Sequence, residues 1–330
     1  MVEVGKIGDK TLVLDGRYIS IFRGGKLVWK KKYMAYYLPD GNGYWYRRRV
    51  RITERSGNTL KYYQIRIEIG AGDPIFAHAR SAGEDIRFCY HPEEEMLSYW
   101  IEKYDPVAEE AIIWVKVPEI PANSEIEIYM YYGNPEVASA SDSEATFIIF
   151  DDFEDGVLDW LVSLGSFTES DGMLYTSSNP GRCYKPNSEA EIAAKFKARV
   201  TAADNAYDIW VDILATGTYS NESGNDGYFV KRYGGGQVWI DRSDDGSATG
   251  LLNISGLPAD TNWHIIEITR DASGKISYYE DGELKGSVTD TTYSSTVNFI
   301  IGGSKGCYYD WILVRKYTYP EPSISIGEEE

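Results

Sequence analysis

The sequence has little cysteine and little histidine, with three of each among 330 residues. Cys89, Cys183 and Cys307 permit at most one disulfide within the chain. We expect three buried thiols, and a bridge between Cys183 and Cys307 is the alternative. No Cys-x-x-Cys pair is present, nor any Cys/His spacing typical of zinc sites. These absences argue against a disulfide-rich scaffold and against a zinc-finger fold.

Basic charge and long apolar runs are lacking as well. The net charge is −18 and the pI is near 4.7, whereas a nucleic-acid-binding surface is expected to be basic. A net negative charge of this size suits a protein that is exposed to salt or to divalent cations. No apolar run approaches the roughly 20 residues of a membrane span. The segment from Met1 to Lys6 lacks the apolar core of a signal peptide, so we expect no such signal in this sequence. We also predict neither a nucleic-acid partner nor a membrane span.

The sequence is rich in aromatic residues and in two-residue alternation. It contains 27 tyrosines and 9 tryptophans, which favour β-sheets and binding surfaces. Ile65, Ile67 and Ile69 share one face of an expected strand, and residues 192–200 alternate in the same way. We therefore predict an all-β protein with two β-sandwich (jelly-roll-like) modules and a short N-terminal β-meander. The predicted boundaries are 1–41 for the extension, 42–146 for the first module and 147–330 for the second.

Four segments of the first module carry motifs that are distinctive in combination, namely Ala79–Phe88, Leu97–Glu102, Ile113–Pro118 and Ile128–Pro135. Together they resemble the uncharacterised DUF2341 family over about residues 42–150. The resemblance implies a β-sandwich found in extracellular, often multidomain, prokaryotic proteins, and it implies no settled activity. The closing Gly133-Asn134-Pro135 is turn chemistry that ends the last strand.

The second module carries a different set of motifs. Trp263–Arg270 leads into a strand pair that turns at Asp281-Gly282, and Tyr309–Tyr317 reads as a closing strand. This pattern resembles the laminin-G/concanavalin-A-like jelly roll over nearly the whole second half. The resemblance implies that the first and last strands of the module lie together.

An acidic cluster opens the second module, where Phe150 and Phe153 bracket several carboxylates. Carboxylates beside buried aromatics need a partner, and Ca²⁺ takes six to eight oxygen ligands. A solvated strand edge is the alternative. Carbohydrate-binding relatives of the jelly roll often hold calcium where the first and last strands meet. The resemblance therefore implies a structural Ca²⁺ site whose main ligands are Asp152 and Asp310, with Asp151 and Glu154 as secondary candidates. The other interpretation is that Asp310 pairs with a lysine or arginine.

Solvent-facing aromatics on a sheet stack against sugar faces while polar neighbours hold the hydroxyls. The candidate ligand-binding residues are Tyr228, Tyr233, Trp239, Trp210 and Asp241. Strand alternation lets only about half of the candidates face outward. The others are then expected in the core.

Motifs for catalysis are absent. There is no Gly-x-Ser-x-Gly elbow and no Glu-x-Asp-x-x-Glu strand of the jelly-roll glycosidases. His264 shares a strand face with Ile266 and Ile268, which indicates a packed core histidine. We therefore predict no catalytic residues.

These patterns favour a non-enzymatic recognition protein, extracellular and displayed on a cell or virion surface. We expect it to bind a glycan or another cell-surface polymer through the second module, as in adhesion. One alternative is an architectural subunit of a virion or surface filament, assembled as a homo-oligomer or a larger structure. It is suggested by residues 1–33, which resemble the short β-segments that begin tail or appendage proteins of viruses. A glycan-active hydrolase that uses carboxylates is the second alternative.

Overall fold

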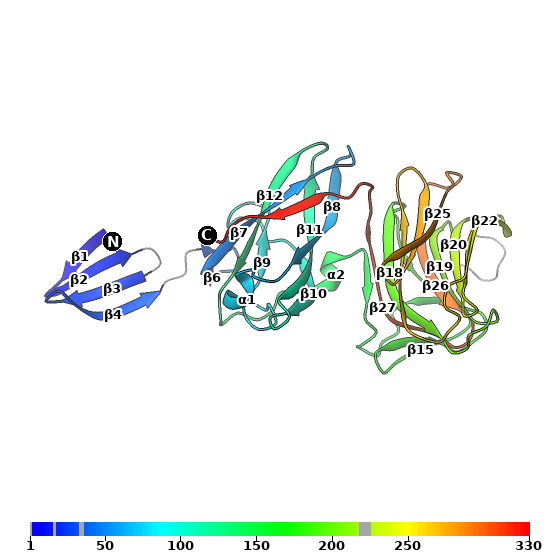
Figure 1. The fold of residues 1–330 in the computed structure, drawn as a ribbon, viewed down its shortest axis with the longest axis horizontal. Helices are drawn as coiled ribbons and strands as arrows, with labels where there is room; N and C mark the ends of the chain where they lie inside the picture. Colours follow the sequence, from blue (N-terminus) through cyan, green and yellow to red (C-terminus); the bar gives the residue numbers. More distant parts are fainter. Residues whose placement is uncertain (1, 16–17, 33–35, 218–225) are drawn as a thin grey trace. The chain divides into compact units, whose positions relative to one another are not determined.

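The computed structural model describes residues 2–15, 18–32, 36–217 and 226–330. The chain divides into two compact units, Met1–Thr146 with Pro322–Glu330, and Phe147–Glu321 (Figure 1). Antiparallel strands make up nearly all of the regular structure, which confirms the all-β prediction. No helix in the described ranges is long and apolar enough to cross a membrane.

The N-terminal strands form a sheet of their own. Its order is β1-β2-β3-β4, with β1 at Val2–Ile7, β2 at Lys10–Asp15, β3 at Tyr18–Arg23 and β4 at Lys26–Lys32. Gly24 and Gly25, with φ of 56° and 75°, form the turn between β3 and β4. Both central residues of such a tight hairpin turn need positive φ, which glycine adopts at little cost. The predicted β-meander is therefore present.

Two sheets face each other in the rest of the first unit. One has the order β10-β11-β8, and its strands are Tyr99–Asp105, Glu110–Ile120 and Leu60–Ile69. The other has the order β28-β7-β12-β9, and its strands are Ser323–Ile326, Tyr46–Thr53, Glu125–Tyr132 and Arg87–Cys89. Smaller elements are β5 at Tyr36–Tyr37, β6 at Gly43–Tyr44, α1 at Ile75–His78 and α2 at Ser143–Thr146. Ile65, Ile67 and Ile69 are buried on the core side, as the alternation predicts.

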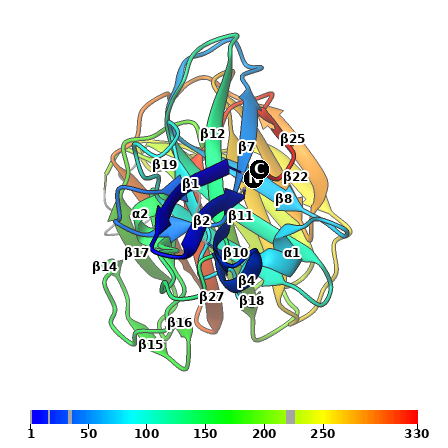
Figure 2. The same cartoon turned by 90° about the vertical axis from the view of Figure 1, so that its left-hand side faces the viewer.

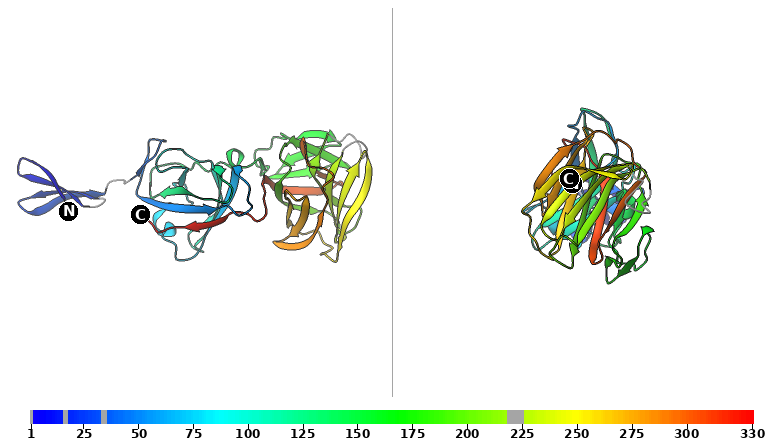
Figure 3. Two further views of the ribbon diagram at one scale, coloured as in Figure 1. Left: turned by 90° about the horizontal axis from the view of Figure 1, so that it is seen from above. Right: turned by 90° about the vertical axis from the view of Figure 1, so that its right-hand side faces the viewer.

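The C-terminal segment belongs to the first unit. Strand β28 pairs antiparallel with β7, with Ser323 opposite Thr53 and Ile326 opposite Val50. Figures 1 and 3 show this segment, in red, beside the blue strand β7, and Figure 2 shows β7 beside β12. The predicted boundary of 147–330 is therefore wrong at its end, because residues 322–330 complete the first sandwich. The second unit is an insertion between α2 and β28.

The second unit is a sandwich of two larger sheets. The seven-stranded sheet has the order β14-β17-β26-β19-β20-β21-β22, with strands Leu161–Leu164, Gly181–Pro186, Asn298–Gly303, Asp208–Ala215, Gly227–Tyr233, Gln237–Asp244 and Ser247–Ser255. The eight-stranded sheet has the order β15-β16-β27-β18-β23-β24-β25, with strands Phe167–Ser170, Met173–Thr176, Cys307–Lys316, Ile192–Val200, His264–Arg270, Lys275–Glu280 and Glu283–Thr289. Its eighth strand, β13 at Ile149–Asp151, pairs with β27.

Two expectations about this unit are confirmed. The first strand β13 lies beside the last strand β27, with Asp151 opposite Ile312. The cysteines are free and buried thiols, so no bridge joins Cys183 to Cys307. One face of each sheet packs into a shared core of branched aliphatic and aromatic residues. The other face of each sheet is left for solvent or a ligand.

Candidate functional site

The outer face of the seven-stranded sheet, the side turned away from the core, gathers most of the predicted ligand residues. Val230 and Ile240 point into the core, so their strand neighbours point outward. Strand pairing then places two rows of side chains on this face. One row is Trp210, Lys231, Trp239 and Asn253. The adjacent row is Asp212, Phe229, Asp241 and Gly250.

Trp239 borders the open part of this face. Its side chain is 40% exposed, and the Tyr233 ring lies edge-on to it at a centroid distance of 5.6 Å. A groove of about 360 Å³ runs beside it, lined by Trp239, Asp241, Ala248, Gly250, Leu251, Leu252 and Asn253. A Cβ at Gly250 would make only an ordinary van der Waals contact, 3.5 Å from Asp241 Oδ1. The groove therefore offers one indole face, one carboxylate and one amide.

Trp210 shares the outer face but is covered by its neighbours. Phe229 stacks on it at 4.9 Å, and its side chain is almost fully buried. Arg182 Cζ lies 3.5 Å and Lys231 Nζ lies 3.7 Å from the indole centroid. Such cation–π contacts stabilise both partners when they are desolvated. Trp210 therefore supports the face, and the accessible aromatic surface is that of Trp239.

Two carboxylates on this face are held away from water. Burial raises the pKa of Asp241, opposed by the charge of Lys231. Burial also raises the pKa of Asp212 to about 7, opposed by Arg182, Trp210 and Lys231. The Asp212 Oδ1 atom accepts a hydrogen bond from Trp210 Nε1, whereas its Oδ2 atom is buried with no hydrogen-bond partner. The sequence analysis missed Asp212 and Arg182, since only the strand register shows that they flank Trp210.

The prediction that Tyr228 binds a ligand is wrong. Its side chain is fully buried among the core residues of the second unit. The hydroxyl donates to Asp290 Oδ1 at 2.6 Å. Tyr228 lies two residues before Val230 in β20, so both side chains point to the core face of the sheet. Phe229 and Lys231 point to the opposite, outer face. Because aromatic residues occupy both faces of this strand, the sequence alone does not show which of them point outward.

Asp310 and Asp151, two of the predicted calcium residues, have other partners. Lys197 Nζ donates to Asp310 Oδ2 at 2.7 Å, in agreement with the ion-pair alternative. Asp310 is the extra residue of a bulge, because Lys197 pairs with Trp311 and Ala198 with Tyr309. Asp151 accepts hydrogen bonds from Trp160 Nε1 at 2.7 Å and from Lys185 Nζ at 3.4 Å.

Asp152 and Glu154 complete the predicted set. Asp152 Oδ1 accepts a weak hydrogen bond of 3.4 Å from the Glu154 backbone. Within the described ranges, no three carboxylates of the set Asp151, Asp152, Glu154 and Asp310 have oxygens within 4.8 Å of one another. The sequence-predicted quartet is thus not assembled around one point.

Glu169, which the sequence analysis did not single out, adds a buried carboxylate near this set, although it too belongs to no group of three ligand residues within 4.8 Å in the described ranges. Both of its carboxylate oxygens are buried with no hydrogen-bond partner. Burial, the contact with Asp155 and the charge of Asp151 raise the pKa of Glu169 to about 7. Burial likewise raises the pKa of Asp151. A bound divalent cation would relieve both the missing partners and the repulsion.

Comparison with known families matches two successive segments of the chain. Residues 82–163 match the model of the domain of unknown function DUF2341. Residues 187–311 match the concanavalin A-like lectin/glucanases superfamily. The chain carries a DUF2341 segment followed by a concanavalin A-like segment. Both resemblances drawn from the sequence, and their order, are therefore confirmed.

Several solved structures resemble about half of the chain. A carbohydrate-binding module from Bacillus subtilis is 9% identical, covering 51% of this chain and 95% of its own, with a TM-score of 0.37. A β-glucanase from Bacillus licheniformis is 13% identical, covering 51% and 98%, with a TM-score of 0.41. A galectin from Caenorhabditis elegans is 15% identical, covering 43% and 94%, with a TM-score of 0.34. Likenesses this distant carry no functional argument. No curated protein sequence matches the chain.

Proposed function

We propose that the concanavalin A-like unit binds a glycan on the outer face of its seven-stranded sheet, in the groove beside Trp239. The observation that carries this proposal is the half-exposed indole on a groove wall that also holds Asp241 and Asn253. A sugar presents an apolar C–H face that stacks on an indole, and its hydroxyls pair with carboxylate and amide groups. The matched superfamily is named for lectins and glucanases, which agrees with this ligand class.

The groove favours a short glycan segment. Its volume of about 360 Å³ lies at the lower end of the range for small-molecule sites. Only one aromatic ring on its wall is substantially exposed, so stacking is available to one sugar ring. Glycan attachment of this kind suits a protein displayed on a cell or virion surface, where adhesion through many copies compensates for weak single contacts.

A glycan array tests this function. The intact protein is screened beside Trp239→Ala and the matched control Trp263→Ala. Trp263 lies against Lys197 and Arg199 of the other sheet, so its replacement removes an indole away from the groove. We expect retention of one glycan class by the wild type and by Trp263→Ala, and its loss in Trp239→Ala. A blank array, or equal loss in both variants, contradicts the proposal.

The same samples distinguish the other functions. Release of reducing ends from a retained glycan would indicate a hydrolase, with Asp241 as the groove carboxylate to replace first. A blank array together with stable homo-oligomers in solution would instead support an architectural subunit of a virion or filament. The array, the reducing-end assay and the oligomeric state together separate the three functions with the same three proteins.

A structural calcium ion is part of the proposal. We place it at Glu169, whose two carboxylate oxygens are buried, with the neighbouring Asp151 and Asp155 as further ligands. These three carboxylates do not lie within 4.8 Å of one another in the described ranges, so they must move closer to share one ion. Calcium should raise the melting temperature and a chelator should lower it, since an ion that binds only the folded state stabilises that state. Glu169→Gln should abolish the calcium response. Asp310→Asn should leave it intact. Loss of the response in Asp310→Asn alone would return the site to the residues predicted from the sequence.

A further inference from the structure

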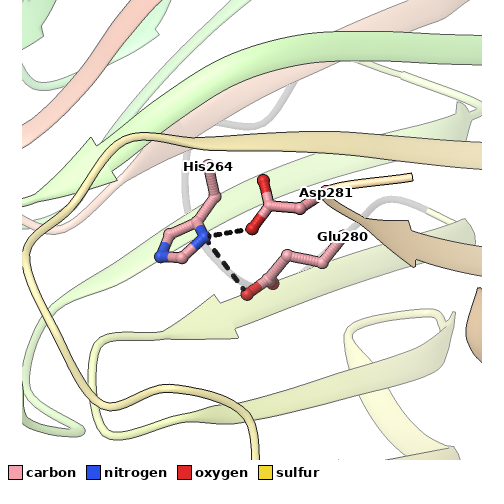
Figure 4. Close-up of side chains that lie close together, drawn as sticks. All are labelled: His264, Glu280 and Asp281. Atoms are coloured by element: carbon pink, nitrogen blue, oxygen red, sulfur yellow. Dashed lines mark hydrogen bonds and ion pairs between the residues drawn. The ribbon is translucent and has the colours of Figure 1, made fainter. Parts of the chain in front are cut away.

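A second cluster of metal-ligating side chains lies in the eight-stranded sheet, away from the groove. His264 begins β23, Glu280 ends β24, and Asp281 opens the turn into β25 (Figure 4). The His264 Nδ1 atom faces Asp281 Oδ2 at 2.8 Å and Glu280 Oε1 at 3.6 Å. The three potential ligand atoms all lie within 4.8 Å of one another. One ion could therefore contact all three.

The backbone fixes this arrangement. Ile266 pairs with Glu280 across β23 and β24, which brings the start of one strand to the end of the other. The turn residues Asp281 and Gly282 have φ of 53° and 82°, as a two-residue hairpin requires. The Ile265 backbone N–H donates to Asp281 Oδ1 at 3.0 Å, so the second carboxylate oxygen is turned toward His264.

The other ring nitrogen is held by a carboxylate. His264 Nε2 lies 3.0 Å from Asp260 Oδ1. When Nε2–H donates to Asp260, the Nδ1 atom of a neutral imidazole carries a lone pair that faces the carboxylates of Glu280 and Asp281. These groups repel one another, and only a cation or a second proton at Nδ1 makes the contact favourable. A ligating histidine whose other nitrogen donates to a carboxylate is the usual outer arrangement of protein metal sites.

The local charge also favours a cation. Asp260, Glu280 and Asp281 contribute −3, and Arg232 contributes +1 through its contacts with Glu280 at 3.2 and 3.3 Å. With a neutral imidazole the sum is −2, which one divalent ion balances. The nearby Lys285 pairs with Glu283 at 2.6 Å, so this pair adds no net charge. Tyr278 donates its hydroxyl to Glu280 Oε2 and helps to hold that carboxylate.

We propose that His264, Glu280 and Asp281 bind a divalent transition-metal ion such as Zn²⁺, with Asp260 orienting the imidazole. Imidazole with carboxylates suits zinc, whereas Ca²⁺ and Mg²⁺ prefer sites made entirely of oxygen. The side chain of Asp281 is 56% exposed while those of His264 and Glu280 are buried, so the ion enters past Asp281. A bound ion would join the first residue of β23 to the turn between β24 and β25.

Zinc titration of chelator-stripped, intact protein tests this site by calorimetry and by melting temperature. Calcium is kept in the buffer so that zinc does not fill the proposed calcium site. Asp281→Asn removes a ligand, and asparagine tolerates the positive φ at this turn. Glu283→Gln is the matched control, because it removes one carboxylate from the same hairpin at an exposed position.

We expect one zinc ion per chain, a melting temperature that rises with zinc, and affinity about tenfold or more weaker in Asp281→Asn. Glu283→Gln should bind as the wild type does. Co²⁺ should bind competitively with Zn²⁺ and give a visible absorption band that Asp281→Asn loses. No zinc binding by the wild type, or equal binding by Asp281→Asn, overturns the proposal, and an unchanged melting temperature at saturating zinc does so as well.

Discussion

Glu54 provides a quantitative test of how one buried carboxylate stabilises the first unit. It follows β7 and accepts backbone hydrogen bonds from Ser56, Gly57 and Asn123, the last two at 2.9 Å. Asn123 lies in the turn between β11 and β12, so Glu54 joins two loops at the same end of the sandwich. Replacing Glu54 by glutamine keeps the shape and turns an amide NH₂ toward N–H donors, where no hydrogen bond can form.

The magnitude follows from the pKa. Hydrogen bonds from Ser56, Asn123 and Gly57 outweigh the effect of burial and lower the pKa of Glu54 from 4.5 to about 2. A difference of about 2.5 units corresponds to about 3 kcal/mol of unfolding free energy. Because the folded-state pKa is depressed, this stability is fully present above pH 4.5 and disappears as the pH falls toward 2.

The assay compares the wild type with Glu54→Gln by hydrogen exchange with mass spectrometry, which follows each unit separately. We expect residues 46–132 to lose about 3 kcal/mol of protection at pH 7, with a smaller difference at pH 3. Glu94→Gln, at an exposed position of the same unit, is the control and should change little. A difference that is the same at both pH values, or below about 1 kcal/mol at pH 7, would refute the assignment of this stability to the carboxylate charge.

Three further outcomes follow from the structure. Deleting residues 322–330 removes Ile324 and Ile326 from the first core and should lower the unfolding free energy of that unit by about 2–4 kcal/mol. Hydrogen exchange in residues 147–321 should stay unchanged. Loss of protection in the second unit instead would contradict the observed pairing. Asp212→Asn should stabilise the second unit above pH 7 by up to about 4 kcal/mol, because burial raises the pKa of Asp212 from 3.8 to about 7 and its ionised form opposes folding. Denaturant unfolding curves should show that this gain vanishes near pH 4. A gain that is independent of pH would be inconsistent with this cause. Cys89, Cys183 and Cys307 should resist a thiol reagent in the native protein and all react after denaturation, and rapid labelling of the native protein would show that a thiol is exposed.

The fold was predictable from the sequence because the alternation of apolar and polar residues along a strand indicates which side chains are buried. Ile65, Ile67 and Ile69 point into the core as predicted, and the Asp281-Gly282 turn lies where its composition places it. The destination of residues 323–326 was not readable, because Ser-Ile-Ser-Ile suits the edge of any half-buried sheet. Strand pairing over long sequence distances decides such cases, and no local pattern encodes it.

The candidate site was predictable only in part. Trp239 and Asp241, two of the candidate ligand residues, line the groove, whereas Tyr228 lies one residue out of phase and enters the core. Glu169 could not be identified, because its missing hydrogen bonds depend on what surrounds it in space. The quartet at Asp151, Asp152, Glu154 and Asp310 failed to assemble because a bulge turns Asp310 toward Lys197.

The insertion of one unit within the other determines how the chain would respond to tension. A pull on Trp45 and Glu330 acts on the same end of β7 and its C-terminal partner, since Arg47 pairs with Glu330 and Thr53 with Ser323. In that geometry the hydrogen bonds open one pair at a time, beginning at Arg47. The concanavalin A-like unit carries no load until the last pair, at Ser323, has opened. The C-terminal strand would thus separate first under tension, and the groove beside Trp239 would be strained only after β28 has left β7.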